Sequence, residues 1–144
     1  MVHISHIAAA WSWLGLHPRA IVAENDFGNV IVEDIQGRYW RICPEEPSCI
    51  VVSGTRADWD QLYASPVFQE DWAMLPLVSE ATARLGSLVP GRKYCLKIPA
   101  VLGGEYGGEN LGTIDFSELI GVSGDMAKQI ADVPDGTSVE IRVV

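Results

Sequence analysis

The chain has 144 residues, a length that fits one domain and buries enough apolar surface to fold without a metal or a disulfide. Its composition, 48% hydrophobic and 20% charged, excludes a disordered protein, and no apolar run reaches the roughly 20 residues of a membrane-spanning helix. The net charge of −9 argues against nucleic-acid binding, which requires clustered Lys and Arg.

The negative charge is concentrated late in the chain. Residues 105–140 contain eight acids and one base, Lys128. Such a segment suits a basic partner, because complementary fields speed encounter, although a merely soluble acidic protein has the same composition. The N-terminus lacks the basic cluster and the cleavage site of a signal peptide, so we expect a cytoplasmic protein.

An apolar helix is predicted first, over about residues 5–17, and His17-Pro18 should end it. Trp11 and Trp13 cannot share one face of this helix. We therefore expect one of them to pack against the body of the domain and the other to be exposed or to lie at an interface.

Four short strands follow and are predicted to form an antiparallel meander. They are separated by turn residues, above all at 25–29 and 44–47. In the third strand Trp40 and Ile42 alternate with Arg41, the period-two pattern of a half-buried strand. The predicted strands cover residues 20–23, 29–33, 38–43 and 49–52.

The middle of the chain carries helix signals. Thr55, with Asp58 three residues later, predicts a helix through Leu62. Ser65-Pro66 predicts the start of another, which Pro76 should kink or divide and Gly86 should end.

The last third is predicted to begin with a strand over 94–98, a glycine-rich loop over 103–110 and a short extended piece at 113–114. Asp115 should then cap a helix reaching about Val133, and a final strand should cover 139–143. The expected apolar stripe of this helix contains Leu119, Val122, Met126 and Ile130, and Gly124 is expected to permit close packing.

These elements predict an α+β fold class with a single domain over residues 1–144. A mostly antiparallel sheet, made of the N-terminal meander plus later strands, should pack against about three to four helices.

No cluster of polar residues in the sequence matches a motif for catalysis, cofactor binding or metal binding. The loop over 103–110 matches neither a dinucleotide fingerprint nor a phosphate-binding loop, so it is interpreted as structural or as presenting Glu105 and Tyr106 to a partner. Glu45 and Glu46 are adjacent on a turn expected to be solvated, an environment that does not separate two pKa values for acid–base work. The three cysteines have no metal-site spacing and are expected to be reduced, partly buried thiols.

Three segments together resemble the C-terminal domain of type VI secretion DNase immunity proteins, long catalogued as a domain of unknown function. The first runs from Glu24-Asn25-Asp26-Phe27-Gly28-Asn29 to Tyr39-Trp40-Arg41-Ile42-Cys43-Pro44-Glu45. The second is Tyr94-Cys95-Leu96-Lys97-Ile98-Pro99 with Leu102-Gly103-Gly104-Glu105-Tyr106, and the third runs from Ser123-Gly124-Asp125 to Pro134-Asp135-Gly136. The family-like region covers about residues 18–144, and longer relatives carry an additional N-terminal domain.

The resemblance implies a non-enzymatic cytoplasmic antidote that binds a cognate protein toxin, expected to be a basic nuclease. The contact residues that we expect for such a partner lie on loops: Glu45, Glu46, Glu105, Tyr106 and Glu109. Two alternatives stay open, a small-molecule-binding or sensor domain with a pocket near Trp40 and Tyr94, and an enzyme of unrecognised type. An antidote predicts an exposed acidic patch, whereas a ligand-binding domain predicts a concave apolar site.

Overall fold

The structure, a computed structural model, describes residues 2–133 and confirms the α+β class. The elements of the first half are α1 (Ile4–Trp11), a 3₁₀ turn (Ser12–Leu14), β1 (Pro18–Glu24), β2 (Val30–Asp34), β3 (Tyr39–Cys43), β4 (Ser48–Ser53) and α2 (Arg56–Ala64). Those of the second half are α3 (Pro66–Ala73), α4 (Leu75–Leu85), β5 (Arg92–Leu96), 3₁₀ turns at Ala100–Leu102 and Gly108–Asn110, β6 (Leu111–Asp115) and α5 (Phe116–Ile130). The final strand predicted over 139–143 lies outside the described residues.

The predicted meander is confirmed as a four-stranded antiparallel sheet in the order β1-β2-β3-β4. The register places Val32 beside Trp40 and Arg41 beside Ile50. Asn25 makes the first turn locally, as its residue type indicates, because its side-chain oxygen accepts from the backbone N–H groups of Phe27 and Asn29, each at 3.0 Å.

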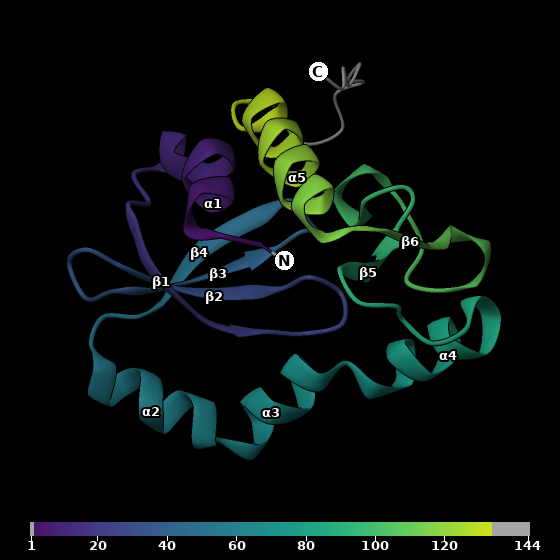
Figure 1. Cartoon of the computed structure of the whole chain (residues 1–144), viewed down its shortest axis with the longest axis horizontal. Coiled ribbons are helices and arrows are strands. Elements are labelled where there is room, and N and C mark those ends of the chain that lie inside the picture. Colours follow the sequence, from purple (N-terminus) through teal and green to yellow (C-terminus); the bar gives the residue numbers. More distant parts are fainter. Residues whose placement is uncertain (1, 134–144) are drawn as a thin grey trace.

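Helices cover both faces of this sheet, with α1 and α5 on one side and α2 and α3 on the other (Figure 1). Trp40 and Ile42 pack toward α1 and α5, while Tyr39 packs among the aromatic residues of α2 and α3. The expectation of a half-buried third strand was therefore wrong. Arg41 points to the second covered face and not to open solvent, and its side chain is only 15% exposed.

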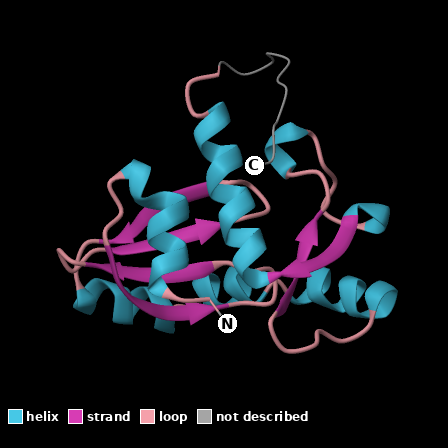
Figure 2. Cartoon of the chain, turned by 45° about the horizontal axis from the view of Figure 1, so that its top comes forward, coloured by secondary structure: helices cyan, strands magenta, loops and turns pink. Residues whose placement is uncertain are grey.

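A smaller unit stands beside the main sheet (Figure 2). The β5–β6 hairpin packs there with α4 around a core that includes Tyr94, Leu96 and Leu111. Phe27, from the turn between β1 and β2, belongs to this core, and the N–H of Tyr94 donates to the carbonyl of Asp26 at 2.9 Å. These contacts fix the hairpin relative to the main sheet.

The predicted helix boundaries follow their capping residues. The Thr55 hydroxyl accepts from the Asp58 N–H at 3.2 Å. The Ser117 hydroxyl and then the Glu118 N–H donate to Asp115, and these bonds lower the pKa of that carboxyl group. The chain between Pro66 and Leu85 divides at Met74, whose φ is 49°, and Pro76 lies in the first turn of α4.

The buried face of α5 differs from the predicted stripe. Leu119 is buried as expected, but Val122, Met126 and Ile130 are only half-buried. The contact with α1 instead combines Ile120 with small residues, and Gly124 lies directly against the backbone of Ala10. A methyl group on Gly124 would lie 2.4 Å from the Ala10 carbonyl oxygen, which confirms the close packing expected there.

We predict that Gly124→Ala lowers the free energy of unfolding by about 2–3 kcal/mol, because the helices must separate to accept the added carbon. Gly121→Ala is the matched control on the same helix, since its added carbon meets nothing within 4 Å. It should be neutral or stabilise the protein by up to about 1 kcal/mol. Urea unfolding of both variants tests this, and equal effects would contradict the packing account.

Candidate functional site

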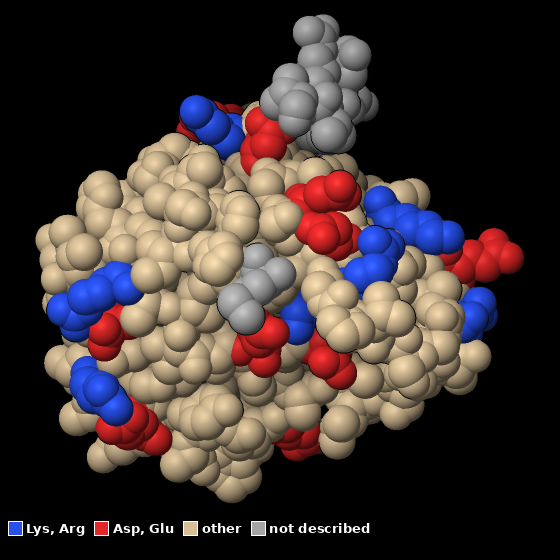
Figure 3. Space-filling model, viewed as in Figure 1, with Lys and Arg blue, Asp and Glu red and all other residues tan. Residues whose placement is uncertain are grey.

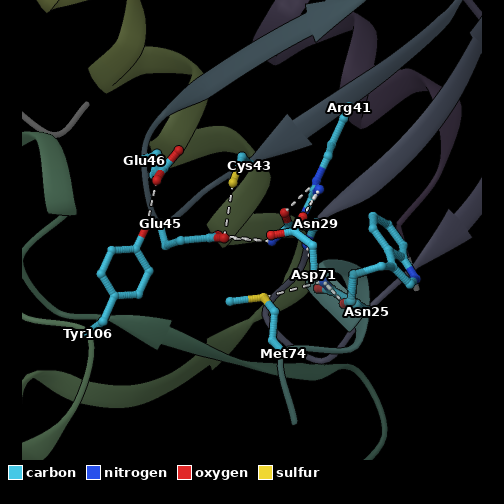
Figure 4. A network of polar contacts seen from close by, with 10 residues as sticks. Asn25, Asn29, Arg41, Cys43, Glu45, Glu46, Asp71, Met74 and Tyr106 are labelled. Atoms are coloured by element: carbon cyan, nitrogen blue, oxygen red, sulfur yellow. Dashed lines mark hydrogen bonds and ion pairs between the residues drawn. The ribbon is translucent and has the colours of Figure 1, made fainter. Parts of the chain in front are cut away.

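A cleft of about 370 Å³ opens where the sheet, the junction of α3 and α4, and the glycine-rich loop meet (Figure 4). The turn from β3 to β4 forms its inner wall. Its lining residues are Arg41, Cys43, Glu45, Glu46, Ser48, Ile50, Asp71, Met74 and Tyr106. We call this hollow the Glu45 cleft.

Glu45 is buried, so the expectation that it lies solvated on an exposed turn was wrong. Its exposed fraction is 5%, whereas the neighbouring Glu46 is exposed. The Asn29 amide nitrogen donates to both oxygens of the Glu45 carboxylate, each at 2.9 Å, and the Cys43 thiol donates to one of them at 3.0 Å. The backbone carbonyl of Glu45 also accepts from the Ala100 N–H at 2.9 Å, which holds the turn against the second unit.

Asn29 connects this buried carboxylate to a cation. Its side-chain oxygen accepts from Arg41 Nε at 3.1 Å, while its nitrogen faces Glu45. Arg41 in turn forms an ion pair with Asp71 at 2.6 Å. Its guanidinium also lies over the rings of Phe68 and Trp72, 5.9 and 5.2 Å from their centroids. Arg41 and Glu45 therefore share Asn29 as a hydrogen-bond partner and form no direct ion pair with each other.

Tyr106 and Glu46 meet at the outer rim of the Glu45 cleft although 60 residues separate them. The Tyr106 hydroxyl donates to Glu46 at 2.8 Å, and its ring remains 47% exposed. Desolvation of the hydroxyl and the hydrogen bond to Glu46 raise the pKa of Tyr106. The phenol therefore stays protonated at neutral pH and keeps its hydrogen bond to Glu46.

The glycine-rich loop is held in place by its own contacts. The Asn110 amide nitrogen donates to the carbonyls of Ile98 and Glu105, and its oxygen accepts from the Ile98 N–H at 2.8 Å. A methyl group at Gly104 would lie 1.7 Å from the Ile98 carbonyl oxygen, so only glycine fits there. This packing supports the structural interpretation of the loop.

The structure brings together three of the five expected contact residues, Glu45, Glu46 and Tyr106, in one cleft. Glu105 and Glu109 are exposed on the same loop as Tyr106 but do not belong to the cleft lining. Sequence reasoning did not single out Asn29, Arg41 or Asp71 as site residues. Asn29 stood out only as a turn residue, and Asp71 had no local signal, because its role depends on the sheet that α3 covers.

The pocket expected near Trp40 and Tyr94 is not formed by those residues. Trp40 is buried in the core under α1 and α5, and Tyr94 in the separate core beside α4. A more apolar hollow of about 320 Å³ lies elsewhere, between the β3–β4 turn, the β5–β6 hairpin and α5, and Pro44, Cys95 and Met126 are among its lining residues. The expectation that Trp40 and Tyr94 lie beside a common pocket was therefore wrong.

The three thiols are free, half-buried and unlike nucleophilic thiolates. Burial raises the pKa of Cys49 to about 12 and also raises the pKa of Cys95. Burial and the adjacent Glu45 carboxylate raise the pKa of Cys43. Among residues 2–133, no group of three or more His, Cys, Asp or Glu side chains is placed to hold a metal ion.

These pKa values predict slow alkylation. At pH 8, iodoacetamide should react with Cys43 and Cys49 of the folded chain at least about 100-fold more slowly than in urea, where the thiols regain ordinary pKa values, and Cys95 should also react more slowly than in urea. Peptide-level mass spectrometry over a time course measures each rate. A cysteine that reacts at the same rate in both conditions would contradict the burial described here.

The hydrogen bonds between Glu45 and Asn29 lead to a prediction about stability. Asn29→Ala should lower the free energy of unfolding by about 2–4 kcal/mol, because it leaves a buried carboxylate and Arg41 without their shared partner. In a Glu45→Ala background the same change should cost about 1–2 kcal/mol less. Urea unfolding of the four proteins in this double-mutant cycle measures the coupling, and identical costs in both backgrounds would contradict it.

The described residues contain no helix long and apolar enough to cross a lipid bilayer. A comparison with curated proteins gives no match. Among solved structures, the fold is similar to one titled "Crystal structure of Atu4351 from Agrobacterium tumefaciens", with a TM-score of 0.54 and 15% sequence identity. That similarity covers 83% of this chain but only 61% of the other, so this chain corresponds to part of a longer protein. At this sequence identity, the similarity shows a shared fold only.

A family model described as "T6SS immunity protein Tdi1, C-terminal" matches residues 55–127. The match includes Asp71, Met74 and Tyr106 of the Glu45 cleft, and it covers a narrower region than the resemblance over 18–144. Because it spans half of the chain, the protein belongs to the family of type VI secretion immunity proteins defined by the C-terminal region of Tdi1.

Proposed function

We propose that the protein is a cytoplasmic immunity protein that binds and neutralises a cognate toxin, and that this toxin is a nuclease. The family match over residues 55–127 carries the proposal. Inhibition requires only that the protein occupies a surface that the toxin needs, so it acts by binding and not by catalysis.

The charge of the chain supports a nuclease as the target. A nuclease contacts phosphates through Lys and Arg side chains, and its substrate site is therefore basic. A chain with net charge −9 is attracted to such a surface and competes there with nucleic acid. On the face shown in Figure 3, the Asp and Glu residues lie in small groups beside Lys and Arg, separated by uncharged surface. The described residues form no continuous acidic patch on that face.

An immunity gene is expected to lie beside the gene of its toxin, and the test uses that neighbouring gene. Cells that express the toxin alone should lose viability, and co-expression of this protein should restore growth. In vitro, the purified protein should suppress DNA cleavage by the toxin near a one-to-one ratio. The association rate should fall about tenfold between low and high salt, because steering between opposite charges is screened.

A catalytically inactive toxin variant is the control for the expression load. Equal loss of growth with and without soluble immunity protein would reject the proposal. Protection from a toxin that cleaves no nucleic acid would reject the nuclease target while leaving neutralisation in place.

A further inference from the structure

The Glu45 cleft continues into a second hollow of about 430 Å³ along α3 and α4. The two hollows share Asp71, Met74 and Tyr106, so they form one groove that runs past the glycine-rich loop. The complete carboxylate lining of this groove is Glu45, Glu46, Glu70, Asp71 and Glu80. Within the described part of the chain, Arg41 is the one Lys or Arg among its lining residues.

Two groove carboxylates are already offset by cations. Arg41, stacked on the aromatic rings of α3, is paired with Asp71, and Arg84 is paired with Glu80. Among residues 2–133, Glu45, Glu46 and Glu70 form no ion pair. The Glu45 carboxylate receives hydrogen bonds from neutral groups only. A carboxylate that is nine-tenths buried, lines a cleft and forms no ion pair of its own favours the entry of a positive charge from outside.

The walls of the groove also suit a long basic side chain. Ile50, 61% exposed at the edge strand β4, and Met74 offer apolar surface for the methylene stem of Lys or Arg. Glu46 lies beyond them at the rim, held by the Tyr106 hydroxyl at 2.8 Å. The carboxylates are therefore fixed before a ligand arrives, which reduces the entropy lost on binding.

We propose that this groove binds a basic segment of the partner protein, with one Lys or Arg side chain entering the Glu45 cleft between Glu45, Glu46 and Asp71. The source of the segment rests on the proposed function, in which the partner is the toxin. The preference of the groove for a basic side chain does not depend on the proposed function, and a peptide tests it directly.

The probe is an acetylated and amidated pentapeptide that contains two arginines. The same peptide with citrulline at both positions keeps the shape of the side chain and removes its charge. Titration at low salt, followed by ¹⁵N–¹H NMR, should shift the backbone amides of Glu46, Asp71 and Tyr106. The arginine peptide should bind about tenfold more tightly than the citrulline peptide, as charge-assisted hydrogen bonds predict.

The variant pair Glu46→Gln and Asp71→Asn, made together, keeps the side-chain shapes and should remove most of the preference for the arginine peptide over the citrulline peptide, while the unchanged Glu45 retains the rest. The matched control combines Asp60→Asn on α2 with Glu118→Gln on α5, which removes the same net charge from exposed positions outside the groove. The control should bind the arginine peptide within about twofold of the unchanged chain, because distant exposed charges are screened.

Equal affinity for both peptides, or shifts that map to another surface, would overturn the proposal. So would a control variant that loses as much affinity as the groove variant. Neutralisation of the toxin together with a failed peptide titration would reject the groove and leave the proposed function standing. A groove that selects arginine in a protein that fails to neutralise the toxin would support the groove and reject the function.

Discussion

The burial of one carboxylate, Glu45, is the constraint on which the arrangement of the cleft depends. Moving a carboxylate out of water costs several kcal/mol unless donors and nearby charge compensate it. Asn29 offsets this desolvation cost with both ends of its amide. Its nitrogen donates to Glu45, and its oxygen accepts from Arg41. Arg41 keeps its position through Asp71 and the aromatic rings of α3. One chain of contacts thus joins the start of β2, the turn after β3 and the helix that covers the sheet.

The two-sided cover of the sheet explains why such a chain of contacts is needed. Trp40 and Ile42 fill one face and Tyr39 the other, so a charged side chain at position 41 enters a covered layer. A guanidinium tolerates this position because it stacks on aromatic rings while its N–H groups bond to carboxylate and amide oxygens. The sheet reaches solvent at β4, where Ile50 is exposed, and the cleft lies beside that strand.

Local signals in the sequence predicted most of the fold. Thr55 and Asp115 cap helices through bonds to residues two or three positions away, and Gly124 marks a close helix contact, so single residues carried these predictions. The site depended on contacts that no local pattern encodes. Tyr106 meets Glu46 across 60 residues, and the burial of Glu45 requires Asn29 from another strand end. A charged residue on a proline-bounded turn is ordinarily exposed, and only the tertiary partners reverse that expectation.

The exposed and the buried acids of the groove should affect different steps in the binding of a basic partner. Glu46 and Asp71 are exposed, so their attraction acts at a distance and salt screens it. Glu45 is shielded from solvent, so its attraction acts only on a charge that has already entered, and salt screens it much less. The exposed acids should therefore govern the rate of association, whereas the buried acid should govern how long the partner stays. Folding has already removed water from the Glu45 carboxylate. The free energy of this desolvation therefore does not weaken the binding of a cation that enters the cleft.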